Sequence, residues 1–128
     1  MAAYHPTAAE LLEAVRGFLG EEIQPALTDH NLSFKLRIAL NVIKIVEREL
    51  QLEPQFAQQE LTSLRNLLDR EEGSPEELNT DLCVRISRGD FDNDDSALLD
   101  HLERAALHKL AIDNPSYSTY QRLLATEE

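Results

Sequence analysis

Four polar residues of this chain recur at the spacing of a single helix face: Arg37, Asn41, Lys44 and Arg48. Residues three or four positions apart lie beside one another on a helix, so the three cationic groups would form one line, here called the cationic stripe. In a chain with a net charge of −12, this line either pairs with acids of the same chain or binds an anionic partner. The abundance of acids favours the first alternative. The second is a phosphate-bearing ligand or an acidic protein surface.

Two charged residues stand out because they fall among apolar ones. On a helical wheel, Lys109 lies within the apolar arc of its helix, and Glu49 lies within the apolar arc of an earlier helix. An unpaired ammonium group is costly to bury. We therefore hypothesise a buried pair between Glu49 and Lys109. The alternative is that Lys109 extends along the apolar surface and places its charge in water.

An acidic loop at residues 90–95 is the segment most similar to a metal site. Three aspartates match the first ligand positions of a calcium-binding loop: Asp90, Asp92 and Asp94. The match then fails, because Asp95 stands where the turn requires glycine and His101 stands where a bidentate glutamate is required. We expect no metal site here but a solvated loop that caps the following helix. Whether this loop binds a cation is left open.

The remaining reactive side chains are isolated from one another. His101 and His108 are seven residues apart, about 10 Å along a helix axis and too far apart to bind one metal ion together. We expect both on a polar outer face. Cys83, the only cysteine, lies on an apolar stripe and is expected to be a small core residue. No phosphate-loop, serine-hydrolase or dithiol motif is present in the sequence. We therefore expect no catalytic residue and no cofactor.

The elements that must position these residues all have helical periodicity. We expect helices at about residues 8–23, 32–52, 54–72, 75–88, 96–112 and 117–125. Thr7 with Glu10, and Ser74 with Glu77, have the spacing of capping boxes, which mark helix starts. Proline at position 54 is expected to begin a new helix, since proline suits a first turn. No segment alternates long enough to predict a strand.

Apolar residues cover an arc of about 240° on the predicted helix at residues 32–52. A surface helix has about half of this, so we expect this segment to have neighbours on most sides. The sequence therefore predicts an all-α fold, a compact bundle of five or six mostly antiparallel helices around a central apolar helix. Residues 1–128 are expected to form a single helical domain.

Charge and composition exclude several classes of protein. A net charge of −12 repels a phosphate backbone, so we expect no binding to nucleic acid. The most apolar helix carries six charged residues, too many for a membrane span. The single cysteine and an N-terminus without a basic or apolar run favour a cytoplasmic location.

Several segments together carry a family resemblance: residues 5–6 with 10–16, 37–41 with 45–50, 78–79 with 82–83, and 101–102 with 109–117. The most specific is Lys-Leu-Ala-Ile-Asp-Asn-Pro-Ser-Tyr at its end. The chain resembles a bacterial domain-of-unknown-function family, over nearly its whole length. The genes of that family commonly lie beside those of acyl-CoA dehydrogenases and of kinases similar to aminoglycoside phosphotransferases. The resemblance implies an association with acyl-CoA metabolism and assigns no catalytic residue.

We therefore expect a non-catalytic accessory or interaction protein. The resemblance implies an acyl-CoA dehydrogenase or a kinase-like protein as its partner. One alternative is a binder of a small phosphate-bearing ligand such as CoA, at the cationic stripe. Another is a regulatory subunit that completes an enzyme's active site. A homodimer also stays open, because a helix as apolar as that at residues 32–52 is suited to form its interface.

Overall fold

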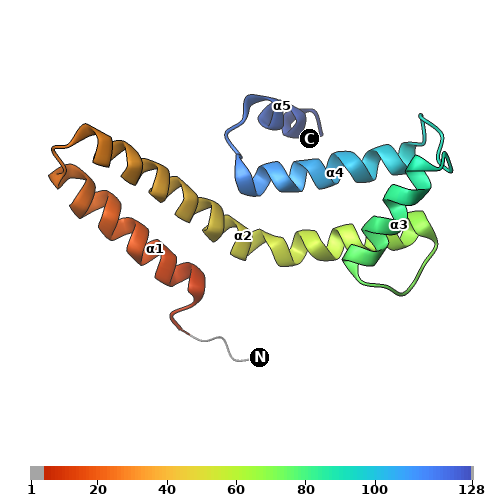
Figure 1. Ribbon diagram of the computed structural model, residues 1–128, viewed down its shortest axis with the longest axis horizontal. Helices are drawn as coiled ribbons and strands as arrows, with labels where there is room; N and C mark the ends of the chain where they lie inside the picture. Colours follow the sequence, from red (N-terminus) through yellow and green to blue (C-terminus); the bar gives the residue numbers. More distant parts are fainter. Residues whose placement is uncertain (1–4, 128) are drawn as a thin grey trace. The chain divides into compact units, whose positions relative to one another are not determined.

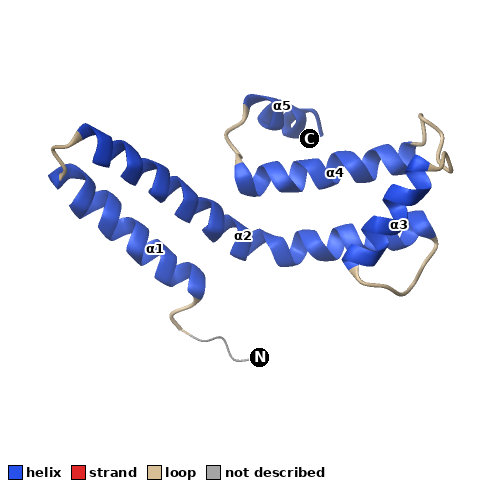
Figure 2. Ribbon diagram, viewed as in Figure 1, coloured by secondary structure: helices blue, strands red, loops and turns tan. Residues whose placement is uncertain are grey.

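The computed structural model describes residues 5–127, and all regular structure in that range is helical (Figure 2). The α-helices are α1 (Ala8–Phe18), α2 (His30–Leu68), α3 (Pro75–Ser87), α4 (Ser96–Asp113) and α5 (Ser118–Glu127). A π-helical turn, Leu19–Ile23, and a 3₁₀ turn, Gln24–Ala26, join α1 to α2. The all-α prediction is confirmed. Residues 1–4, on which part of the expectation about a targeting segment depends, lie outside the described residues.

The chain divides into two compact units. Unit 1 holds Met1–Glu53 and Ile112–Asn114, and unit 2 holds Pro54–Ala111 and Pro115–Glu128. The first half of α2 belongs to unit 1 and its second half to unit 2. The single domain expected over residues 1–128 stays a prediction, and each unit is described here by itself.

Helix α2 is one continuous element where the sequence predicted two. The expected break between residues 52 and 54 is wrong, since α2 runs from His30 to Leu68 with Pro54 inside it. Proline in a helix interior removes one backbone hydrogen bond and costs about 3 kcal/mol. The residues after Pro54 are mostly good helix formers, and packing in each unit holds the helix on its own side of the proline. No helix within residues 5–127 has both the length and the apolar character that crossing a bilayer requires.

The predicted helix starts are confirmed at both capping positions. Thr7 is the N-cap of α1, where its hydroxyl accepts from the Glu10 amide at 3.2 Å and the Glu10 carboxylate accepts from the Thr7 amide at 3.2 Å. These backbone and side-chain hydrogen bonds from Thr7 lower the pKa of Glu10. Ser74 is the N-cap of α3, and its hydroxyl accepts from the Glu77 amide at 3.1 Å. Local hydrogen bonds therefore set both starts.

Unit 1 is built on a helical hairpin, in which α1 runs beside the first half of α2 (Figure 1). Arg16 of α1 donates from Nε to both carboxylate oxygens of Glu47, at 2.9 and 3.2 Å. Hydrogen bonding to Glu47 raises the pKa of Arg16. At the closed end, a Cβ atom on Gly20 would lie 3.7 Å from Leu40 Cδ1, and Leu40 is buried. The hairpin is thus held by one partly buried ion pair and a close approach at Gly20.

Most of the apolar arc of α2 in unit 1 is uncovered. Six of its large side chains are at least 36% exposed: Leu32, Phe34, Ile38, Val42, Val46 and Leu50. The covered side of this half of α2 carries Leu36, Leu40 and Ile43. The structure therefore differs from the expectation that neighbours cover residues 32–52 on most sides. A wide apolar arc indicates that burial of this surface is favourable, but it does not show that the same chain provides the cover.

The core of unit 2 lies among the second half of α2, α3 and α4. Its buried members are Leu64, Leu68, Leu78, Leu82 and Leu98. Asp81 of α3 accepts hydrogen bonds from Arg85 at 3.1 Å and from Arg70 at 3.0 Å, and these bonds, led by that from Arg85, lower its pKa. Arg85 also donates to the Leu68 carbonyl at 3.2 Å. Two contacts therefore hold α3 to the end of α2: Asp81 with Arg70, and Arg85 with the Leu68 carbonyl.

Candidate functional site

The cationic stripe lies on the first half of α2, in unit 1. Arg37, Asn41 and Lys44 are exposed, and none of them has a hydrogen bond or ion pair to another residue within the described part of the chain. Arg48 is half-buried, and its Nε donates to the Ile112 carbonyl at 2.8 Å. Carbonyls near a helix C-terminus carry partial negative charge, so a guanidinium group is well placed there. The stripe thus presents two cations to solvent and uses the third to hold the end of α4.

The residues of the hypothesised buried pair are both exposed. Glu49 is on the unit 1 half of α2, and Lys109 is on the unit 2 part of α4. The expectation of burial is therefore not met, because neither side chain faces a covered side of its helix. Pairing between them stays a prediction.

The acidic loop before α4 acts as a helix cap. Asp95 accepts a hydrogen bond from the Leu98 amide at 3.0 Å, so the expected capping role is confirmed. Asp90 pairs with the Arg88 guanidinium, and this hydrogen bond lowers the pKa of Asp90. Within the described residues, no group of three or more histidine, cysteine or acidic side chains is arranged to hold a metal ion.

Cys83 is exposed, so its expected place in the core is wrong. The buried side of α3 carries Leu78 and Leu82. Position 83 follows Leu82 by about 100° around the helix, which turns the thiol away from the core. The apolar stripe of α3 is therefore narrower than the sequence indicated.

His101 is buried at 6% exposure, so the prediction of a polar outer position for this residue is wrong. Its Nδ1 shares a hydrogen bond of 2.7 Å with Ser63 Oγ on α2. Burial lowers the pKa of His101, which favours the neutral ring. A polar partner on the facing helix satisfies the imidazole, which is why a histidine is tolerated beside a leucine core.

His108 is also covered, and it is the centre of a more unusual arrangement. Its Nδ1 lies 2.9 Å from Glu60 Oε2, and its ring stacks on Phe56 with centroids 3.9 Å apart and planes at 5°. Phe56 and Glu60 are four residues apart on α2, so both reach the same place on α4. The carboxylate orients the imidazole and the phenyl ring covers one of its faces.

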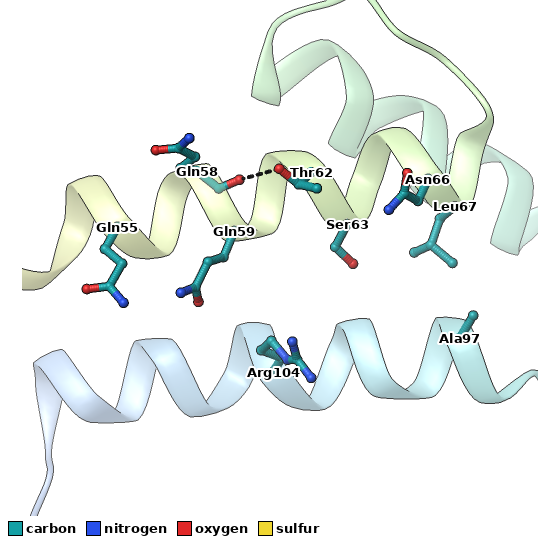
Figure 3. Close-up of a pocket in the computed structure, with 9 residues that line it drawn as sticks. All are labelled: Gln55, Gln58, Gln59, Thr62, Ser63, Asn66, Leu67, Ala97 and Arg104. Carbon is teal, nitrogen blue, oxygen red and sulfur yellow. Dashed lines mark hydrogen bonds between the residues drawn. The ribbon is translucent and has the colours of Figure 1, made fainter.

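A polar groove runs between the second half of α2 and α4. It has a volume of about 720 Å³ and is lined mainly by amide and hydroxyl side chains, with Arg104 as its charged lining residue. Figure 3 shows Gln55, Gln59 and Ser63 directed from α2 toward α4, where Arg104 lies. Gln58 points away and accepts at its backbone carbonyl from the Thr62 hydroxyl, at 3.0 Å. The groove is rich in donors and acceptors, as a site for a polar ligand requires.

A second cavity of about 340 Å³ lies beside the polar groove. Gln59 and Arg104 line both of them. His108 of α4 and Tyr120 of α5 also line the second cavity, which we call the aromatic pocket. Together the two cavities place a guanidinium, an imidazole, a phenol and several amides within one region of unit 2. This set suits recognition of an anionic group next to an apolar one.

The sequence analysis missed this region of unit 2. The predicted break at Pro54 assigned Phe56 and Glu60 to a separate helix, whose neighbours were not identified. One signal was available: Arg104 and His108 stand four residues apart on α4. Their proximity to Glu60 depends on how α2 and α4 pack, which helical periodicity does not determine.

The comparisons with known proteins identify a family but no characterised relative. Residues 25–117 match a family described as a domain of unknown function (DUF6285). Neither the curated proteins nor the solved structures contain a significant match. The matched range includes the cationic stripe, the polar groove and most of both units. The chain therefore belongs to this domain-of-unknown-function family.

Proposed function

We propose that the protein is a non-catalytic accessory module that docks onto a protein partner through an exposed apolar surface of α1. The surface consists of Leu11, Val15 and Phe18, which are 53%, 50% and 51% exposed. Their spacing places them on one face of α1. Exposed apolar surface of this kind is typical of protein interaction sites, and this exposure carries the proposal.

Charges around the α1 surface define the partner further. Glu21 and Glu22 are exposed just beyond the end of α1, whereas Arg16 is paired with Glu47. The surface is therefore apolar with acidic side chains at its C-terminal end. Complementary charge favours a partner with an apolar patch next to lysine or arginine.

The resemblance described above supplies the class of partner. It implies an acyl-CoA dehydrogenase or a kinase-like protein. A cytoplasmic location is part of the proposal and rests on the single cysteine. The accessory role is supported by the exposed apolar helix faces of the described residues. A related alternative is that the module completes the partner's active site, for which the exposed cations of Arg37 and Lys44 are suited.

The docking proposal is tested by direct binding to a purified acyl-CoA dehydrogenase and a purified kinase-like protein, the two classes of partner that the resemblance implies. The variant Val15→Ser/Phe18→Ser removes the apolar groups and is expected to weaken binding about tenfold or more, because central apolar contacts carry most interface energy. Val84→Ser is the matched control, since Val84 is 49% exposed on α3. Isothermal titration measures both. Equal affinity of the double variant and the control would exclude α1 as the docking surface.

A second function, binding of a small anionic ligand, is favoured by the geometry of unit 2. The groove collects Arg104 and several amides in one hollow, which suits a phosphate-bearing ligand such as CoA better than the cationic stripe on a helix face. In the stripe, Arg48 is already bound to a carbonyl. The groove offers Arg104 and several amides, and His108 lines the neighbouring aromatic pocket.

Thermal unfolding with acyl-CoA tests this second function and locates the site. Ligand at 100 times its dissociation constant adds about 2.7 kcal/mol to the free energy of unfolding. We expect Arg104→Ala to abolish this stabilisation and Arg37→Ala to leave it unchanged. The reverse pattern would place the ligand on the cationic stripe. No stabilisation of the unsubstituted protein would exclude this ligand.

A further inference from the structure

The exposed apolar residues of α2 form a regular ridge. Five of them follow one another at intervals of four positions: Phe34, Ile38, Val42, Val46 and Leu50. We call this set the α2 ridge. Its members are 36% to 57% exposed. The covered side of the same half-helix carries Leu36, which is half-buried, and Leu40, which is buried. The ridge is therefore a second apolar surface, separate from that of α1.

The α2 ridge is symmetric about Val42. Four positions away on either side are the β-branched residues Ile38 and Val46, and eight positions away are Phe34 and Leu50. The side chains of the ridge are therefore similar in type when read from either end. Two such ridges in antiparallel orientation present matching side chains to each other. This is the property that a two-fold symmetric interface requires, where residue i meets residue j and j meets i.

Two charged residues beside the ridge are also placed symmetrically about Val42, and their charges have opposite signs. Lys35 and Glu49 each stand seven positions from Val42. Seven residues make two helical turns, so both lie about 10 Å from Val42 along the axis and within about 20° of its direction. Both side chains are exposed. Both charges therefore point in nearly the same direction as Val42, at the two ends of the ridge.

We propose that α2 pairs in antiparallel orientation with α2 of a second copy of this chain, about a two-fold axis at Val42. In this register, the two Val42 side chains meet each other and Ile38 lies beside Val46 of the second copy, while Phe34 and Leu50, about 80° from the direction of Val42, flank the contact. Lys35 meets Glu49 of the second copy, twice by symmetry. The centre of the ridge and both charges then find a complementary partner.

The charges favour the antiparallel orientation and a second copy of this chain as the partner. A parallel pairing in register would set Lys35 against Lys35 and Glu49 against Glu49, and like charges at close range destabilise a helix pair. The antiparallel pairing sets opposite charges together. Exposed ion pairs add little affinity, so the apolar ridge supplies the attraction and the charges determine the register. The inference does not rest on the proposed docking of α1, because the two surfaces share no residue.

Charge reversal of the full-length chain tests the pairing. Lys35→Glu and Glu49→Lys each set two like charges against each other in the dimer. We expect each variant to weaken self-association about tenfold or more, measured by sedimentation equilibrium. Lys44→Glu is the matched control, with the same charge change on the same helix. Because Lys44 points about 160° away from Val42, it is expected to leave self-association unchanged.

Mixing the two variants gives the most specific result. A chain with glutamate at both positions and a chain with lysine at both positions repel themselves and attract each other. The equimolar mixture is therefore expected to form a heterodimer with about the affinity of the unsubstituted dimer. The double variant Lys35→Glu/Glu49→Lys, which exchanges the charges within one chain, should dimerise again. A mixture that remains monomeric would overturn the proposal.

A variant on the symmetry axis separates self-association from folding. Val42→Asp places two carboxylates against each other and is expected to abolish the dimer. Helical circular dichroism should be retained, because Val42 is 52% exposed within the single chain. An unsubstituted chain that stays monomeric at high concentration would overturn the proposal. So would a monomer that uses the α2 ridge to bind the dehydrogenase or the kinase-like protein.

Discussion

Replacing Leu78 with alanine is expected to lower the free energy of unfolding by about 2–5 kcal/mol. Leu78 of α3 is 0% exposed and packs in the cluster of unit 2 with Leu64 and Leu68. The substitution removes buried apolar surface and leaves a cavity that its rigid neighbours fill only in part. The aromatic pocket and the polar groove are built on the same helices, α2 and α4. Urea denaturation followed by circular dichroism measures the loss.

The matched control for this prediction is Leu99→Ala on α4. Leu99 is 48% exposed, so the same chemical change removes little buried surface and should cost well under half as much as Leu78→Ala. A similar loss in both variants would mean that the leucine cluster is not the core of unit 2.

Replacing Pro54 with alanine is expected to raise the stability of the chain, by up to about 3 kcal/mol. Proline inside α2 has no N–H to donate to the carbonyl four residues earlier, and its ring crowds that carbonyl. Alanine restores the donor and is the best helix former. The midpoint of thermal unfolding should rise. Hydrogen exchange should reveal a protected amide at position 54.

Pro25 provides the comparison for Pro54. It stands at the start of the 3₁₀ turn, where the missing N–H has no helical partner to lose. Pro25→Ala should therefore give no gain, and a small loss is expected because alanine gives the unfolded chain more freedom. If Pro54→Ala likewise gave no gain, α2 would not be a continuous hydrogen-bonded helix through this position.

Helix starts were predictable because their causes are local. Thr7 and Ser74 cap their helices through residues three positions away, and no distant contact is needed. The end of α3 before Gly89 is of the same kind, since Gly89 adopts a positive φ of 84° that glycine accepts readily. The starts of α1 and α3 were therefore assigned correctly from sequence alone.

The length of α2 was not predictable from the same local rules. Proline at position 54 is equally compatible with a first turn and with a strained interior position. The choice between them depends on packing at Leu64 and Leu68 in unit 2, which lies well outside the local window. Tertiary contacts therefore overrode the signal that the sequence analysis followed.

The histidines show a second limit of a helical wheel. A wheel gives the relative directions of side chains, but it does not show which direction another helix covers. His101 and His108 lie on a side of α4 that has polar neighbours in sequence. That side nevertheless packs against α2, where His101 hydrogen-bonds to Ser63 and His108 to Glu60. The candidate site in unit 2 depends on those two contacts, so it was accessible only from the structure.

The membership of Ile112–Asn114 in unit 1 has a practical consequence for dissecting this protein. The polypeptide passes from one unit to the other three times, so no single cut yields both units whole. A fragment ending at Glu53 would retain the Arg48 guanidinium without the carbonyl that it binds. Excision of unit 1 for separate study, or its transfer into a hybrid gene, would therefore need the end of α4 to be supplied as a separate peptide.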